Sequence, residues 1–114
     1  MTDLTISMPI RGDTTVLELR GELDLASAHQ LRRSVRAVLH EDDPSRLALD
    51  LSGLSFTDSM GLSVMVWAHQ RMVERGHVLY LVAPRPSVVE VLRVTGLDKR
   101  LNIQARMPGD HPVV

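Results

Sequence analysis

The sequence LALDLSGLSFTDSMGLSVMV, residues 47–66, contains the change of period that decides the fold. Its first part, LALDL, is a short continuous apolar run, which is typical of a strand covered on both faces. After the polar joint at Asp58 and Ser59, apolar residues recur at helical spacing from Leu62 until Gly76 ends the helix. A buried strand that leads directly into a helix is half of a βαβ unit, so this stretch predicts an α/β fold.

Upstream of this stretch, strict apolar alternation predicts strands at 4–10 and 17–23, joined into a hairpin by the turn residues RGD at 11–13. The period then changes to that of an amphipathic helix, which starts near Ala26 and ends before Pro44. The predicted apolar face of this helix comprises Ala28, Leu31, Val35, Val38 and Leu39.

Downstream, we expect a strand at 77–82, a third helix that opens at Pro86 and ends at Gly96, and a weak last strand near 101–103. The predicted apolar positions of the second helix are Leu62, Met65, Val66, His69, Met72 and Val73. The order of elements predicts parallel βαβ units with right-handed crossovers after the hairpin. The expected structure is a mixed sheet of four or five strands packed with about three helices. The expected core comprises Leu19, Leu23, Leu31, Val35, Leu47, Leu49, Leu62, Val66, Leu79, Leu81 and Leu92.

Length and composition favour one small domain in a reducing compartment. The chain has 114 residues, of which 44% are hydrophobic, and we expect a domain over residues 1–105 with a disordered tail over 106–114. Thirteen Lys and Arg against 14 Asp and Glu give a net charge of -1, which argues against nucleic acid or an anionic membrane as partner. Cysteine is absent, and no apolar run approaches the about 18 residues of a membrane span, so we expect a cytoplasmic protein.

Three carboxylates are expected near the carboxyl ends of the strands, where parallel α/β sheets concentrate function. Asp24 follows the second strand, Asp50 is placed at the end of the third, and Asp58 lies in the loop before the second helix. Capping of a helix or turn is the commoner role of aspartate at such positions, and we expect it for Asp24 and Asp58. The role of Asp50 stays open.

Ser59 has two interpretations, which differ by one residue in where the helix starts. If Ser59 is the N-cap, its hydroxyl accepts a backbone N–H and its role is structural. If Asp58 is the cap, Ser59 lies in the first turn with a free hydroxyl. A phosphate on that hydroxyl would meet unpaired N–H groups and the positive end of the helix dipole, while adding about -1.5 to -2 charge beside Asp58.

Catalytic, metal and nucleotide sites find little support in the sequence. TDSMG is not the G-x-S-x-G elbow of a serine hydrolase, and the five histidines show no ligand spacing, so we expect no enzyme and no metal. Neither Gly-rich phosphate motif occurs, and no cofactor is expected. A receiver domain phosphorylated on Asp50 is also disfavoured, because this sequence shows neither the paired acids after the first strand nor the lysine after a later strand that a receiver domain needs. Trp67 lies within a mostly apolar helix and is interpreted as a packing residue.

Three segments together resemble the STAS domain family, specifically the stand-alone bacterial anti-sigma-factor antagonists. They are RGELDLASAHQLRRSV, LALDLSGLSFTDSMGLSVMV and VVEVLRVTGLDKRL, and the similarity runs from about Thr5 to Leu101. The most specific element is the D-S-x-G-L loop, which stands in register with GELD and TGLD.

The resemblance implies that phosphorylation of a serine switches partner binding on and off. In that family an anti-sigma factor that is also a serine kinase phosphorylates the loop serine, here Ser59. The unphosphorylated antagonist binds this partner and frees the sigma factor, and a phosphatase resets the switch. By the same resemblance, the partner-binding residues are Asp24, Asp58, Ser59, Met60 and Gly61, with Gly61 allowing close approach of a partner or phosphate.

The alternative is a STAS adaptor in a bacterial stress-signalling complex whose Ser59 is not phosphorylated. Met60 favours it, because the family has a small residue at this position and methionine is bulky and apolar. The resemblance implies regulation of stress response, sporulation or development. The family commonly ends with another helix after the last strand, whereas QARMPGDHPVV has no apolar period that predicts one. We expect a monomer or a weak dimer.

Overall fold

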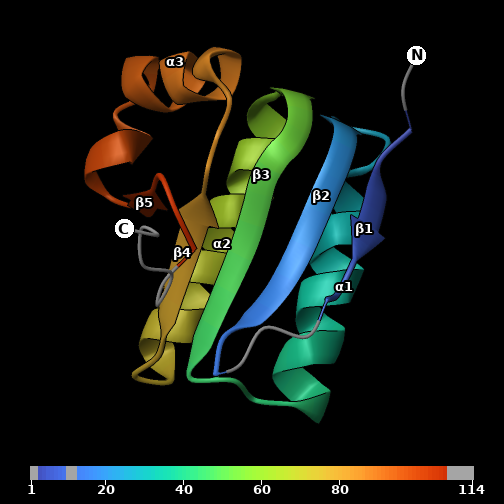
Figure 1. The fold of residues 1–114 in the computed structure, drawn as a ribbon, viewed down its shortest axis with the longest axis vertical. Coiled ribbons are helices and arrows are strands. Elements are labelled where there is room, and N and C mark those ends of the chain that lie inside the picture. The colour runs from blue at the N-terminus through green and yellow to red at the C-terminus, as the bar shows by residue number, and fades with distance from the viewer. Residues whose placement is uncertain (1–2, 10–12, 108–114) are drawn as a thin grey trace, which may run out of the picture.

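The computed structural model describes residues 3–9 and 13–107, and their element order agrees with the sequence prediction. Figure 1 shows one sheet with helices packed against it. The strands are β1 (Thr5–Ser7), β2 (Thr15–Leu23), β3 (Arg46–Thr57), β4 (Val78–Val82) and β5 (Asn102–Gln104). The helices are α1 (Ala28–Glu41), α2 (Ser59–Glu74) and α3 (Pro86–Val94), followed by a short 3-10 turn, η1 (Leu97–Lys99).

The sheet is mixed and has its five strands in chain order, which confirms the predicted α/β class. β1 pairs antiparallel with β2, and every later pair is parallel. Sequential parallel neighbours require a crossover between them, and α1 and α2 supply the first two. The predicted turn at 11–13 and the end of the first predicted strand, Ile10, fall partly outside the described residues.

β3 is much longer than predicted, and its two halves have different neighbours. As far as Asp50 it is flanked by β2 and β4, and Asp50 pairs with Val82, the last residue of β4. Beyond that point β3 continues beside β2 alone until Thr57, which pairs with Leu23. The sequence after the apolar run, SGLSFT, contains serine, threonine and glycine, so the apolar pattern did not predict that the strand continues through it.

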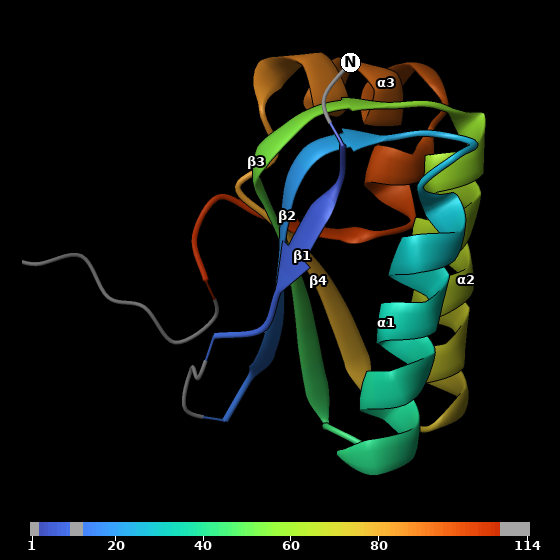
Figure 2. The same cartoon turned by 90° about the vertical axis from the view of Figure 1, so that its right-hand side faces the viewer.

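α1 and α2 cover one face of the sheet and enclose the main core with it (Figure 2). Of the eleven predicted core residues, ten are buried, and the exception is Val66, which is half-buried. The face of α2 is turned relative to the prediction, with His69 half-buried and Val73 exposed. Its buried residues are Gly61, Leu62, Val64, Met65, Ala68 and Met72. The predicted face of α1 is confirmed in full.

The opposite face of the sheet carries a smaller apolar cluster. Val16, Ala48 and Val82 are buried there together with Met107. Met107 belongs to the segment expected to be a tail, and its burial shows that the packed part of the chain reaches this residue. The rest of the predicted tail, 108–114, lies outside the described residues.

α3 lies at the end of the molecule where β3 rises beyond β4 (Figure 1). The Arg85 Nε–H donates to the carbonyl of Ser52 at 2.8 Å, and the Ser87 hydroxyl donates to the carbonyl of Ser55 at 3.2 Å. These contacts supply donors to backbone acceptors that β4 has left without a partner strand. Arg93, further along α3, pairs with Glu90, and this hydrogen bond raises the pKa of Arg93.

Candidate functional site: the carboxyl edge around Ser59

The parallel pairing of β2 with β3 brings the loops after both strands to one edge of the sheet. Leu23 and Thr57, the last residues of the two strands, are partners in register. The N–H of Asp58 continues the contact by donating to the carbonyl of Leu23 at 3.1 Å. Asp24 and Asp58 therefore leave the sheet side by side, as expected for residues at the carboxyl ends of neighbouring strands.

Asp58 is the N-cap of α2, and its carboxylate also holds the neighbouring loop. Oδ1 accepts the N–H of Gly61 at 3.0 Å, while Oδ2 accepts the N–H of Leu25 at 2.9 Å. One oxygen thus satisfies a free donor of the first helical turn, and the other ties the start of α2 to the loop after β2. The capping role predicted for Asp58 is confirmed.

Ser59 is consequently the first residue of α2, and the N-cap interpretation of its hydroxyl is excluded. Its side chain is exposed, and the hydroxyl has no partner among the described residues. The first intrahelical donor is the N–H of Leu62, which reaches the carbonyl of Asp58 at 3.0 Å. The N–H groups of Ser59 and Met60 therefore have no helical acceptor and face the end of the helix.

Asp24 shapes the loop that Asp58 holds. Its Oδ1 accepts the N–H of Ala26 at 3.0 Å, the N–H of Ser27 at 3.1 Å and the hydroxyl of Ser27 at 3.1 Å. The carbonyl of Glu22, at 3.0 Å, is a second acceptor for the single hydrogen of this hydroxyl, whose oxygen accepts the N–H of Asp24 at 2.9 Å. The predicted capping role is confirmed as a turn before α1, although the N-cap of that helix is Ser27.

Three apolar side chains are exposed along this edge, and sequence reasoning identified only Met60. Leu25 is 64% exposed, Phe56 48% and Met60 42%. We call these three residues the apolar rim. Leu25 is bound to Asp58 through its backbone, Phe56 lies two residues before Asp58, and Met60 follows Ser59. Leu25 and Phe56 could have been recognised because each falls just outside the apolar period of its element.

Gly61 has a role inside the domain that the resemblance did not indicate. It is buried, and a Cβ added to it would lie 2.3 Å from Thr57 Oγ1 and 2.7 Å from Leu23 Cγ. Only glycine lets the first turn of α2 pack this closely onto the ends of β2 and β3. Packing explains the glycine, and its contact with a partner stays a prediction.

Asp50 lies apart from this edge, which corrects the expectation that it ends its strand. It stands inside β3, and its Oδ1 accepts the N–H of Ser52 at 3.0 Å. The remainder of β3, from Asp50 to Thr57, rises roughly 20 Å. Asp50 therefore takes no part in the site around Ser59.

Two other kinds of site, a metal centre and a membrane-spanning helix, are absent from the described residues. Among residues 3–9 and 13–107, no three His, Cys, Asp or Glu residues are grouped so that they could hold a metal ion. Within the same ranges, no helix has the length and apolar character needed to cross a bilayer.

Comparison with known proteins places the chain in one family. Residues 5–107 match the STAS domain family. The anti-sigma-F factor antagonist RsfB of Mycobacterium tuberculosis strain H37Rv is 29% identical over 101 residues, which cover 88% of this chain and 80% of RsfB.

Two solved structures have the same fold. The crystal structure of an anti-sigma factor antagonist from Mycobacterium paratuberculosis superposes with a TM-score of 0.83 at 26% identity, covering 92% of this chain and 88% of that one. The unphosphorylated form of the anti-sigma factor antagonist SpoIIAA superposes with a TM-score of 0.69 at 20% identity, covering 92% and 89%. At that identity the likeness to SpoIIAA concerns the fold alone.

Proposed function

Because this chain belongs to the STAS domain family, we propose that it is an anti-sigma factor antagonist, a binding module that regulates transcription without catalysing a reaction. Relatives that carry this name, such as RsfB, align over most of its length. The domain acts in the cytoplasm, where it binds an anti-sigma factor, and it needs no cofactor, nucleic acid or membrane.

The observation that carries this proposal is the position of Ser59. The residue is exposed at the first position of α2, its hydroxyl is unpartnered among the described residues, and Asp58 supplies the cap. The apolar rim of Leu25, Phe56 and Met60 adds an exposed apolar surface at the same edge. Such a surface beside an accessible hydroxyl suits a partner that both docks there and acts on the serine.

Phosphorylation of Ser59 by a kinase that is also the anti-sigma factor turns binding off. The phosphate is compatible with the fold, since the free N–H groups of Ser59 and Met60 and the helix dipole favour an anion at this end of α2. It is incompatible with docking, since it places about -1.5 to -2 charge among apolar side chains that a partner would bury. A phosphatase restores the binding form.

Asp24 and Asp58 serve this surface by shaping it. Both carboxylates accept backbone N–H groups within the domain, and together they hold Leu25 and Ser59 in position. Any direct contact they make with the partner uses the lone pairs that these hydrogen bonds leave. Their substitution therefore weakens binding through the shape of the edge as well as through charge.

The second candidate function is that of an adaptor that docks through the same edge without phosphorylation. The exposure of Met60 favours it, because a bulky side chain next to Ser59 obstructs a kinase more than it obstructs a binding partner. Under this alternative the apolar rim still makes the contact.

The test combines kinase treatment with calorimetry. The purified protein is incubated with Mg-ATP and the anti-sigma kinase encoded beside it, and intact mass is measured together with the affinity of Ser59→Ala and Ser59→Asp for that kinase. The antagonist function predicts one phosphate on the wild type and none on Ser59→Ala. It also predicts binding by the alanine variant, and weakening of about 100-fold, or about 2.7 kcal/mol, when Ser59 is phosphorylated. The weakening in Ser59→Asp is smaller, because one carboxylate carries less charge than a phosphate.

Binding without any mass change, and equal affinity of both variants, would select the adaptor. Absence of binding by every form would reject both candidates. Thermal melts of the two variants provide the control, because residue 59 does not cap the helix and neither substitution is expected to unfold the domain.

A further inference from the structure

A second surface, well separated from Ser59, lies between α1 and α2. Figure 2 shows the two helices side by side on one face of the sheet. The hollow between them encloses about 190 Å³, and none of its lining residues is acidic. We call it the arginine groove, and its lining residues are Arg36, Leu39, His40, Trp67, Arg71 and Arg75.

Three arginines gather around Trp67: Arg36 and Arg71 from the groove lining, and Arg32, one turn earlier on α1. The guanidinium carbons of Arg32, Arg36 and Arg71 lie 4.9, 5.6 and 6.0 Å from the centre of the Trp67 ring. One cation over an indole ring stabilises a helix pair, but three cations also repel one another. Packing was the predicted role of Trp67, and it accounts for the buried part of the ring but not for this accumulation of charge.

The arginines form two rows of like charge at helical spacing. Arg32 and Arg36 are four residues apart on α1, and Arg71, in the last turn of α2, lies four residues before Arg75, the C-cap residue of that helix. Like charges at this spacing destabilise a helix, so the pair within α1 is not explained by the stability of the isolated domain. It is explained if an anionic partner lies beside it.

The existing ion pairs leave Arg32 and Arg36 available and engage Arg71 only weakly. Arg71 pairs with Glu74 at 3.4 Å, and both side chains are largely exposed, so the pair is weak. Among the described residues, no carboxylate lies within ion-pairing distance of Arg32 or Arg36.

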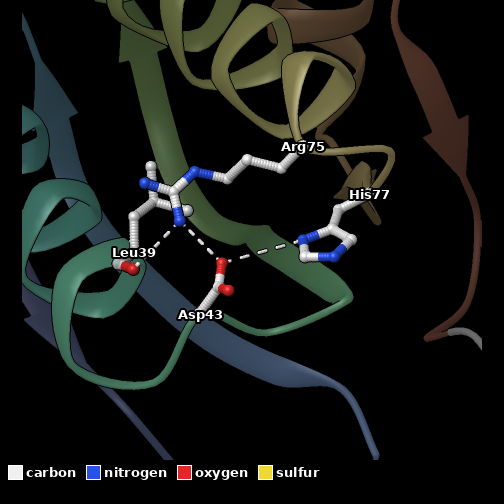
Figure 3. A network of polar contacts seen from close by, with 4 residues as sticks. All are labelled: Leu39, Asp43, Arg75 and His77. Carbon is white, nitrogen blue, oxygen red and sulfur yellow. Dashed lines mark hydrogen bonds and ion pairs between the residues drawn. The ribbon is translucent and has the colours of Figure 1, made fainter.

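Arg75 is the fixed end of the groove. Figure 3 shows its guanidinium between Asp43 and the carbonyl of Leu39. Its Nη1 donates to Asp43 Oδ1 at 2.6 Å and to the Leu39 carbonyl oxygen at 3.2 Å, while His77 Nδ1 lies 3.9 Å from the same carboxylate oxygen. These contacts join the ends of α1 and α2 and so fix the two helices relative to each other at this end of the groove. Arg32, Arg36 and Arg71 project from the helices that are held in this way.

We propose that the arginine groove docks an acidic helical segment of a partner protein. Guanidinium groups bind carboxylates with two parallel hydrogen bonds, and Arg32 and Arg36, one helical turn apart, match glutamates spaced four residues apart on a third helix that also passes Arg71. The groove favours a protein segment over nucleic acid because the whole chain carries a net charge of -1 and has no extended positive field.

The two surfaces are separate enough to act independently. Along α2, the eight residues from Ser59 to Trp67 rise about 12 Å, and Arg71 lies further still. A partner at the apolar rim and an acidic segment in the arginine groove therefore bind without competing for the same side chains. The groove proposal goes beyond the antagonist function and does not depend on it.

Trp67 allows a direct test, because it is the only tryptophan of the chain. An alanine-based helical peptide with glutamates four residues apart is titrated into the full-length protein, and Trp67 emission is followed. The matched peptide has glutamine at the same positions. We expect a saturable change with the glutamate peptide and none with the glutamine peptide, with affinity that falls as salt is added.

Charge reversal inside and outside the groove provides the control. Arg36→Glu should weaken the glutamate peptide about tenfold or more, whereas Arg33→Glu, an exposed residue of the same helix outside the groove lining, should leave affinity within about twofold. Both variants have the same net charge. Ser59→Asp should bind the peptide like the wild type, which separates this test from that of the antagonist function.

Three outcomes would overturn the proposal: equal binding of the two peptides, equal weakening by the two arginine variants, or tighter binding of a single-stranded RNA of matched charge than of the glutamate peptide. Thermal melts exclude misfolding as the cause of lost binding. If Arg36→Glu lowers the melting temperature, Arg36→Gln replaces it and should still weaken the peptide more than Arg33→Gln does.

Discussion

The edge around Ser59 and the arginine groove are built in opposite ways. At the edge, the charged side chains point into the backbone: Asp58 accepts two N–H groups, and Asp24 accepts two more. In the groove, Arg36 and Arg71 stand on complete helices, and Arg36 makes no hydrogen bond to the backbone among the described residues, whereas Arg75 at the C-cap of α2 donates to the carbonyl of Leu39. The first surface is thus made of loops that carboxylates hold in shape, and the second is made of side chains on a rigid support.

This difference shows which residues combine two roles. A carboxylate that ties two loops together determines both stability and the shape of the binding surface, so its loss affects the two together. An exposed arginine on a helix determines mainly the local charge. We therefore expect substitutions at the edge to reduce the free energy of unfolding in order of their burial, and substitutions of the exposed groove arginine Arg36 to leave it nearly unchanged.

Gly61→Ala should have the largest effect on stability. The new methyl group would lie 2.3 Å from Thr57 Oγ1 and 2.7 Å from Leu23 Cγ, so α2 must move away from the sheet. We expect a loss of about 1–3 kcal/mol in urea unfolding, net of the helix preference for alanine. Ser63→Ala, on an exposed position of the same helix, is the control. A stability equal to that of the wild type would show that the edge is looser than its contacts indicate.

Asp58→Ala should have an intermediate effect. It removes the N-cap of α2 and the acceptor of the Leu25 N–H, and we expect a loss of about 1–2 kcal/mol. Hydrogen exchange at the amides of Gly61 and Leu25 should accelerate together, because one carboxylate protects both. Acceleration at Gly61 alone would mean that the tie between the two loops contributes little.

Ser59→Ala and Arg36→Gln should have the smallest effects, each within about 0.5 kcal/mol of the wild type. Both residues are exposed, and neither side chain has a hydrogen bond among the described residues. Their consequences should appear in binding only, each at its own surface. A loss near 1 kcal/mol for Ser59→Ala would indicate that the hydroxyl, and not Asp58, caps the helix in solution.

The sequence predicted the order of elements and nearly the whole core, because both follow from local periods of apolar residues. Its main error within the core was on α2, where apolar residues occur on more than one side of the helix and the buried face had to be chosen. The continuation of β3 was also missed, since its pairing with β2 depends on a register that no local pattern contains.

From the sequence alone, the role of the Ser59 hydroxyl was limited to two alternatives, a helix cap or a free hydroxyl. Two capping residues stand next to each other, and either one starts a helix with acceptable local geometry. Asp58 became the cap because β2 places the N–H of Leu25 within reach of its second oxygen, a contact between residues 33 positions apart. Likewise, Gly61 is needed because two strand ends lie under it, and the arginine groove exists because α1 and α2 pack side by side on the sheet. The spacing of apolar residues along the chain determines which face of each helix or strand is apolar. Hydrogen bonds and charge interactions between segments distant in sequence act only over short distances, and the folded sheet brings those segments close enough.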